Sequence, residues 1–236
     1  KISNFEHYDI VINTDHFSLI TKKYFNKQIV KKYNSIAYTT IIEHKKILND
    51  TAIQIFTKNG PLAFLPISSD KTSIVYSINN LKNNNFEKIK ELINHYNFKY
   101  KIKKFNILES FELKGFSLRS YHNNKFLAFG DLLHRIHPLA GQGFNMTIRD
   151  IKVLLKIIEN KKNLGLPFDY SVNSIFEKQT RHKNFIFANG IDLIHEFFNF
   201  ERKIKNKTLS KSIKFLGKNS KIKNAFTRLA DKGINF

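Results

Sequence analysis

The first third of the chain carries hydrophobic residues in the pattern of β-strands. Residues 52–56 and 73–78 alternate apolar and polar side chains with a period of two, and residues 35–42 are rich in β-branched and aromatic types. A shorter apolar run covers residues 8–12. Together these segments predict a mainly antiparallel sheet.

Helical periodicity becomes the dominant pattern after Gly143, where apolar side chains recur on one face of each predicted helix. The elements predicted after the first third are helices at 86–96, 148–158 and 172–200 and short strands near 105–108 and 126–129. The order of strands followed by helices predicts an α+β fold whose character changes at Gly130.

Length and composition fit a folded globular protein. The chain has 236 residues, of which 42% are hydrophobic, and it can bury a sizeable core. It contains neither the apolar run of roughly 18 to 20 residues that spans a bilayer nor a signal-peptide pattern, so we expect a cytoplasmic location. The absence of cysteine excludes disulfides, thiol catalysis and cysteine-ligated zinc. Because the first residue is Lys1 and the one methionine is Met146, we expect the chain to begin inside a longer protein.

The formal net charge of +21 allows two interpretations. It is typical of proteins that bind nucleic acids or anionic membranes, but lysine spread over solvated faces by a biased genome composition has the same effect. The lysines are dispersed and do not alternate with stacking aromatic residues, so we expect no nucleic-acid partner. In residues 203–232, however, apolar residues recur at near-helical spacing among many lysines, which predicts a basic helix at a membrane surface.

Residues 125–131 form an apolar segment that ends in Gly-Asp and is followed by a glycine-containing loop and a helix. Gly141 and Gly143 let the backbone approach a ligand, and a helix start offers free N–H groups to an anion. Asp131 can accept hydrogen bonds from a sugar hydroxyl. This pattern alone fits both a site for a phosphate-bearing cofactor and a tight connection capped by Asp131.

The residues of this turn carry a specific resemblance. Residues 130–145 read GDLLHRIHPLAGQGFN and resemble the second flavin motif of the p-hydroxybenzoate-hydroxylase-like monooxygenases, which contains Gly-Asp, His, His-Pro, a Gly-Gln-Gly turn and Asn. Residues 51–66 read TAIQIFTKNGPLAFLP and are similar to the substrate-domain signature of the ubiquinone-biosynthesis hydroxylases. The chain thus resembles the FAD-dependent 2-polyprenylphenol hydroxylases of that superfamily.

Two weaker resemblances extend over most of the chain. Asp15 lies where the family has an Asp-Gly pair that contacts flavin and nicotinamide, although His16 replaces the glycine. The predicted last helix contains Arg181 and Asn184, which match an arginine and an asparagine that recur in the family's C-terminal helix.

The resemblance implies a p-hydroxybenzoate-hydroxylase-like flavoprotein divided into four segments. These are the end of the first part of the FAD-binding domain at 1–34, the substrate-domain sheet with one helix at 35–115, the second part of the FAD-binding domain at 116–160, and C-terminal helices at 161–236. The family's N-terminal Rossmann βαβ unit has a Gly-x-Gly-x-x-Gly turn that this sequence lacks. We therefore expect the given chain to be N-terminally truncated, unable to bind FAD tightly and inactive alone.

The resemblance also implies the chemistry, which is hydroxylation of a prenylated phenol with FAD, NADPH or NADH, and dioxygen through a flavin hydroperoxide. The chemistry is flavin-based, and no catalytic side chain is assigned. The implied partners are the prenylated phenol, a membrane surface in contact with the basic C-terminal helices, and a multi-enzyme ubiquinone assembly. The implied cofactor-binding residues are Asp131, Pro138, Gly141, Gln142, Gly143, Phe144, Asn145 and Asp15, and the candidate substrate-side residues are Phe56, Leu62, Phe64 and Leu65.

Departures from the family pattern leave alternatives open. Leu132 and Leu133 replace two small alanines, so the packing beside the flavin has to tolerate extra volume. The alternative functions are a degenerate flavoprotein and a non-catalytic basic module that binds a membrane or a partner.

Four polar residues near the turn receive a structural interpretation. His134 and His137 are spaced like metal ligands, but no third ligand supports a metal site, and we interpret both as scaffold or flavin-side residues. We interpret Arg149 and Asp150 as a solvated or helix-start ion pair.

Overall fold

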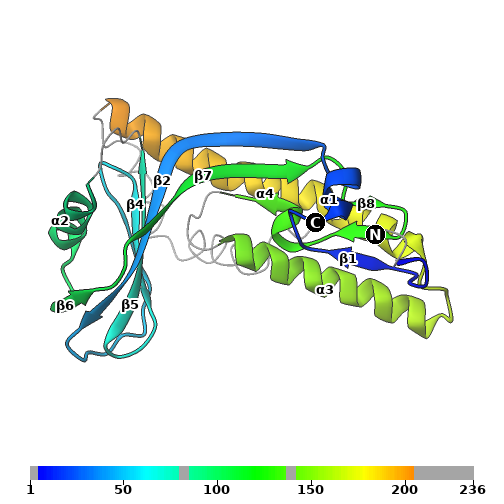
Figure 1. Ribbon diagram of the computed structural model, residues 1–236, viewed down its shortest axis with the longest axis horizontal. Helices are drawn as coiled ribbons and strands as arrows, with labels where there is room; N and C mark the ends of the chain where they lie inside the picture. The colour runs from blue at the N-terminus through cyan, green and yellow to red at the C-terminus, as the bar shows by residue number, and fades with distance from the viewer. Residues whose placement is uncertain (1–4, 80–84, 137–141, 205–236) are drawn as a thin grey trace, which may run out of the picture. The chain divides into compact units, whose positions relative to one another are not determined.

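The computed structural model describes residues 5–79, 85–136 and 142–204. By internal contacts the chain divides into two compact units, one formed by Lys1–Lys31 with Lys114–Phe236 and the other by Lys32–Leu113. Figure 1 labels most of the elements of both units. In chain order they are β1 (Val11–Asn13), α1 (Leu19–Tyr24), β2 (Gln28–His44), β3 (Ile53–Phe56), β4 (Pro61–Pro66), β5 (Lys71–Asn79), α2 (Phe86–Tyr96), β6 (Ile102–Phe105), β7 (Glu109–Leu118), β8 (His122–Asn123), β9 (Phe126–Ala128), β10 (His134–Arg135), α3 (Gln142–Asn163) and α4 (Tyr170–Ile204), with a 3-10 turn at Gly130–Leu132.

The unit formed by Lys32–Leu113 is an antiparallel sheet with one helix, α2. The strands follow the order β2-β5-β4-β3, and β6 pairs with β2. The side chain of Asn85 caps α2 by accepting a hydrogen bond from the backbone N–H of Glu87 at 3.2 Å. The helix then buries Ile89 and Ile93 completely in the core that one face of the sheet supplies.

Most of the predicted strands are confirmed. Two differ in position. Residues 105–108 span the end of β6 and the connection to β7, because the pairing of β6 with β2 ends at Phe105. The backbone N–H of Asn106 makes one more hydrogen bond to β2, to the carbonyl of Ile41 at 2.9 Å. β1 begins only at Val11, because its parallel partner β9 offers three residues for pairing.

The second unit contains the Gly130 turn. Its small sheet has the order β1-β9-β8, with β1 and β9 parallel and β8 and β9 antiparallel. The helices α3 and α4 pack against each other in this unit, and both contribute to its core (Figure 1). The core residues from α3 are Leu154 and Ile157, and those from α4 are Val172 and Phe176.

No helix among the described residues is long and apolar enough to cross a membrane. The predicted membrane-surface segment 203–232 lies almost entirely outside the described part of the chain.

Candidate functional site

Two parallel strands end side by side and bring the predicted cofactor residues to one edge. β1 and β9 pair with Asn13 opposite Ala128, and the backbone N–H of Phe129 continues the ladder to the carbonyl of Asn13 at 2.9 Å. The residues that follow both strands, Asp15 on one side and Asp131 on the other, therefore leave the sheet at the same edge. Ligands of α/β sheets bind at the carboxyl ends of parallel strands.

The turn after β9 depends on the conformation of Gly130. Its φ is +65°, in the left-handed region where a side chain is strained. The backbone N–H of Leu133 donates to the carbonyl of Gly130 at 2.9 Å and closes a short 3-10 turn. Asp131 is exposed within this turn, whereas the leucines on its C-terminal side are buried. The turn thus presents a carboxylate at the edge of the sheet.

The extra volume of Leu132 and Leu133 is absorbed by the core. Both side chains are 0% exposed and belong to the core cluster that includes Leu154 of α3 and Phe176 of α4. They point into the protein, so the larger side chains fill the interior beneath the turn.

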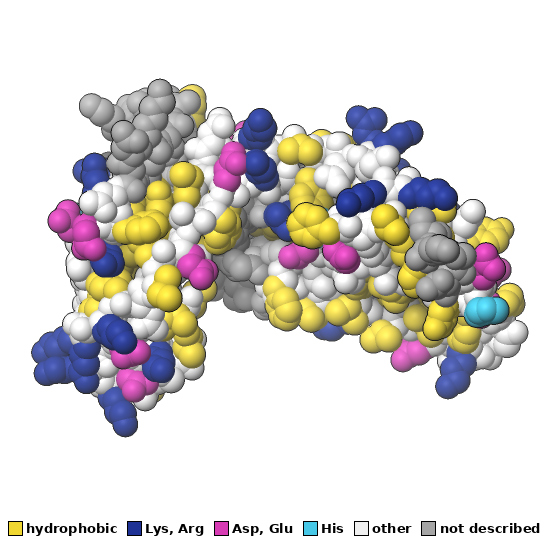
Figure 2. All heavy atoms as spheres, in the orientation of Figure 1, with side chains coloured by type: hydrophobic (Ala, Val, Ile, Leu, Met, Phe, Trp, Pro, Cys, Tyr) yellow, Lys and Arg dark blue, Asp and Glu magenta, His cyan; other side chains and the backbone are white. Residues whose placement is uncertain are grey.

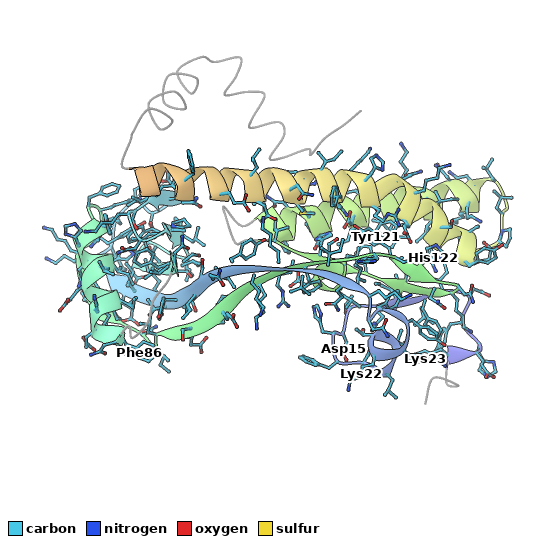
Figure 3. The ribbon with its side chains drawn as sticks, turned by 90° about the horizontal axis from the view of Figure 1, so that it is seen from above. Asp15, Lys22, Lys23, Phe86, Tyr121 and His122 are labelled. Atoms are coloured by element: carbon cyan, nitrogen blue, oxygen red, sulfur yellow. The ribbon has the colours of Figure 1, made fainter. Side chains whose placement is uncertain are left out.

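Hydrogen bonds within the connection from β1 to α1 hold Asp15 in place. The Oδ1 of Asp15 accepts from the backbone N–H of Phe17 at 2.8 Å, and the hydroxyl of Thr21 donates to the carbonyl of Asp15 at 2.6 Å. Asn13 donates to Thr21 Oγ1 at 2.7 Å, and Ser18 caps α1. Figure 3 labels Asp15 beside Lys22 and Lys23 of this helix. The carboxylate is therefore oriented by its own turn.

His16, Arg135 and the phenyl ring of Phe116 form a cluster next to these carboxylates. The His16 ring meets the Phe116 ring edge-on at 5.1 Å, and the Arg135 guanidinium lies over the same ring at 5.2 Å. Burial and the positive charge of Arg135 lower the pKa of His16, and the carboxylates of Asp131 and Asp15 oppose this shift only in part. The imidazole is therefore neutral at neutral pH.

Asp150 is a core residue, so its interpretation as a solvated or helix-start ion pair was wrong. It lies about two turns into α3, between the buried positions Met146 and Leu154. Its side chain is 2% exposed and accepts hydrogen bonds from His134 Nε2 at 3.0 Å and from Asn184 Nδ2 at 3.0 Å. His134 is accordingly a scaffold residue.

Arg149 and Tyr121 lie close to this buried cluster. The Arg149 guanidinium lies 4.3 Å from the centre of the Phe187 ring, and its burial lowers its pKa. Burial also raises the pKa of the Tyr121 phenol, and a hydrogen bond with the Asn184 side chain opposes that shift. The network thus continues from α3 through Asn184 to Tyr121. Arg181, which was matched to the family's arginine, forms an ion pair with Glu177 at 2.8 Å.

The structure places the other predicted cofactor residues at the start of α3. Gln142 is buried, Gly143 and Asn145 are half-buried, and Phe144 is 72% exposed. Pro138, Gly141 and His137 lie outside the described residues.

The predicted substrate-side residues divide between the two faces of the other unit's sheet. Leu62 and Phe64 are 0% and 1% exposed and belong to the core beneath α2, so they are not available to a ligand. Phe56 and Leu65 are exposed. Alternation along β4 explains the division, because residues 62 and 64 point to one face and residues 61, 63 and 65 to the other.

Comparison with known proteins identifies the family. Residues 11–161 match the family model described as "FAD binding domain", and the chain belongs to this family. It is 30% identical over 156 residues to the 3-demethoxyubiquinol 3-hydroxylase of Escherichia coli, a match that covers 63% of this chain and 40% of that protein. The chain therefore spans less than half of this relative's length.

Solved structures confirm the fold class. The chain is similar to the flavin-dependent brominase Bmp2, with a TM-score of 0.64, 13% identity and coverage of 94% of this chain and 57% of the other. It is also similar to pqsL, a probable FAD-dependent monooxygenase from Pseudomonas aeruginosa, with a TM-score of 0.55, 14% identity and coverage of 83% and 56%. The predicted α+β flavoprotein fold is confirmed.

The residues at the strand ends fit one part of an FAD molecule. Asp131 offers a carboxylate at the common edge of β1 and β9, as a ribityl hydroxyl requires. Two buried polar atoms, His16 Nε2 and Gln142 Oε1, have no hydrogen-bond partner among the described residues. An unpartnered buried polar group costs about 1–3 kcal/mol, so a polar ligand that forms hydrogen bonds with these two atoms would remove that cost.

Proposed function

We propose that the protein hydroxylates the ring of a prenylated phenol in ubiquinone biosynthesis, with FAD as its cofactor and NADPH or NADH as the electron donor. Membership of the FAD-binding family and the ubiquinol-hydroxylase relative support this reaction class. The observation that carries the proposal is the common edge of β1 and β9, where Asp15 and Asp131 leave the sheet together beside the start of α3.

The chain's own residues would orient the cofactor. Asp131 would accept a hydrogen bond from the ribityl chain, and the first turn of α3, from Gln142 to Asn145, would lie along the ring and pyrophosphate. The helix start favours the negative charge of the pyrophosphate. When bound, FAD supplies the redox chemistry, in which electrons from the nicotinamide reduce dioxygen, one oxygen atom enters the phenol ring and the other leaves as water.

The open face of the sheet in the Lys32–Leu113 unit suits an apolar substrate. Leu65 of β4, Ser73 of β5 and Ile41 of β2 are paired across the strands and lie on one face, together with the exposed Phe56. Hydrophobic side chains are exposed among charged ones on this unit in Figure 2.

A hollow of about 680 Å³ lies on the same unit and supports the same assignment. Its lining combines hydroxyl-bearing and apolar residues with the charged residues Lys104 and Glu109, so it offers both apolar contacts and polar groups for a phenol with a hydrocarbon substituent. Among the lining residues are Thr39, Ile41, Ser73, Phe105 and Ile107. We propose that the prenylated phenol lies along this face, with Phe56 and Leu65 in contact with it.

The test uses the full-length protein encoded by the gene. The purified protein is expected to carry FAD, to consume NADPH or NADH with a prenylated phenol, and to form a product that gains one oxygen atom from labelled dioxygen. Asp131→Ala is expected to weaken FAD binding at least tenfold, and Asp70→Ala serves as a control carboxylate in the other unit. A colourless protein that sediments with anionic vesicles would overturn the enzyme proposal and support the membrane-binding module. Bound flavin that no nicotinamide reduces would support the degenerate flavoprotein.

A further inference from the structure

Three buried polar side chains from three elements meet inside the unit that carries the Gly130 turn. His134 comes from β10, Asp150 from α3 and Asn184 from α4, and they are 3%, 2% and 7% exposed. Asp150 Oδ2 accepts from His134 Nε2 at 3.0 Å and from Asn184 Nδ2 at 3.1 Å, and Oδ1 accepts from the same amide at 3.0 Å. Both carboxylate oxygens thus have donors that are themselves buried.

Packing alone does not account for an acid at this position. Met146 and Leu154, one turn before and after Asp150 on the same face of α3, are buried apolar residues. Burying a carboxylate costs free energy that its hydrogen bonds only offset, and apolar side chains of similar volume often serve stability equally well or better. What an acid adds is direction, because its donors have to lie at defined places.

The three side chains lie where they can fix the position of the start of α3, which carries the proposed cofactor residues at 142–145. His134 belongs to the last strand before residues 137–141, and Asp150 to the helix that follows them. The hydrogen bond between them therefore joins β10 to α3. Asn184 adds α4 to the same point, so three elements are held at one carboxylate.

We propose that His134, Asp150 and Asn184 form a buried clamp that holds β10 and α3 at the spacing that FAD binding requires. They are positioning residues, since they act through the start of α3. The inference rests on the proposed function, because it assumes that the start of α3 binds FAD. It predicts that loosening the clamp weakens FAD binding more than an equal loss of stability elsewhere in the unit does.

Two buried asparagines of α4 provide the central comparison. Asn184 donates to Asp150, whereas Asn173, which is 0% exposed, donates through Nδ2 to the carbonyl of Asn124 at 3.0 Å. Asn184→Ala and Asn173→Ala each remove a buried amide from the same helix. The FAD dissociation constant is measured by flavin fluorescence on the protein as its gene encodes it, and thermal unfolding is measured without FAD. We expect Asn184→Ala to raise the dissociation constant at least tenfold and Asn173→Ala to change it less than threefold, at similar losses of melting temperature.

A second pair of variants addresses the other donor. His134→Gln keeps an N–H that can reach Asp150, and His134→Leu removes it. The clamp predicts that the glutamine variant retains FAD affinity within about threefold while the leucine variant loses it, and that the absorption band of any flavin still bound to the leucine variant loses its vibrational fine structure. Equal dissociation constants for Asn184→Ala and Asn173→Ala, or for the two His134 variants, would overturn the clamp. If the unmodified protein binds no FAD, the proposed function fails instead, and the two failures are thereby distinguished.

Discussion

Replacing Leu132 and Leu133 with the alanines usual in the family tests whether the core has adapted to the larger side chains. Both leucines are 0% exposed and lie in a core that includes Leu154 and Phe176. Truncating a fully buried leucine to alanine costs about 2.7–5 kcal/mol, because the lost transfer free energy is added to that of the cavity. Each variant is therefore expected to lower the free energy of unfolding by about 3 kcal/mol or more.

Thermal and urea unfolding followed by circular dichroism measure this loss. For a chain of this length 1 kcal/mol corresponds to about 2–4 °C, so each variant is expected to melt roughly 6–12 °C lower. Leu155→Ala is the matched control, because Leu155 lies in α3 and is 52% exposed, and its effect is expected to stay within about 0.5 kcal/mol. The loss of unfolding free energy in the double variant need not equal the sum of the two single losses, because the two residues are neighbours. Alanine variants as stable as the unmodified protein would refute the conclusion that the core accommodates the extra volume.

Further predictions concern the two turns and one helix cap. Gly130→Ala places a side chain at φ +65° and is expected to cost about 1–2 kcal/mol in urea unfolding; no loss would mean that the turn relaxes. His16 is expected to titrate by NMR below its usual pKa of 6.5, and Arg135→Gln is expected to raise that pKa. Because the folded pKa is lowered, the contribution of His16 to stability is present above pH 6.5 and is lost as the pH falls through the folded pKa; a midpoint above the usual value would contradict this. Asn85→Ala is expected to cost about 1 kcal/mol by removing the cap of α2, and Asn85→Asp, which keeps an acceptor, is expected to cost less.

Local periodicity predicted the elements that bury one face and missed those that depend on distant pairing. The helix at Phe86–Tyr96 and the strands around residues 35–42 and 73–78 follow from the spacing of their apolar residues. By contrast, β8 and β10 contain two residues each, and their pairing with β9 and β7 defines them. No local pattern distinguishes such short strands from loops.

The same limit explains the error at Asp150. An acidic residue in a helix is normally solvated, so a prediction from the spacing of apolar residues places it on the exposed face. The donors that make its burial possible lie 16 and 34 residues away in the sequence. The one available signal was its position, four residues after Met146 and four before Leu154, in the middle of a buried stripe.

His16, Leu132 and Leu133 all differ from the family pattern, and the packing of the protein accommodates all three side chains. A glycine is needed where φ is positive, and among the described non-glycine residues only Asn34 and Asn124 have positive φ. The backbone φ at His16 is therefore not positive, so this position does not need a glycine. The His16 ring packs against that of Phe116. The leucines fill the core beneath the other strand end. The carboxylates of Asp15 and Asp131 remain at the edge shared by β1 and β9, so the substitutions change the packing near this edge and leave both carboxylates in place.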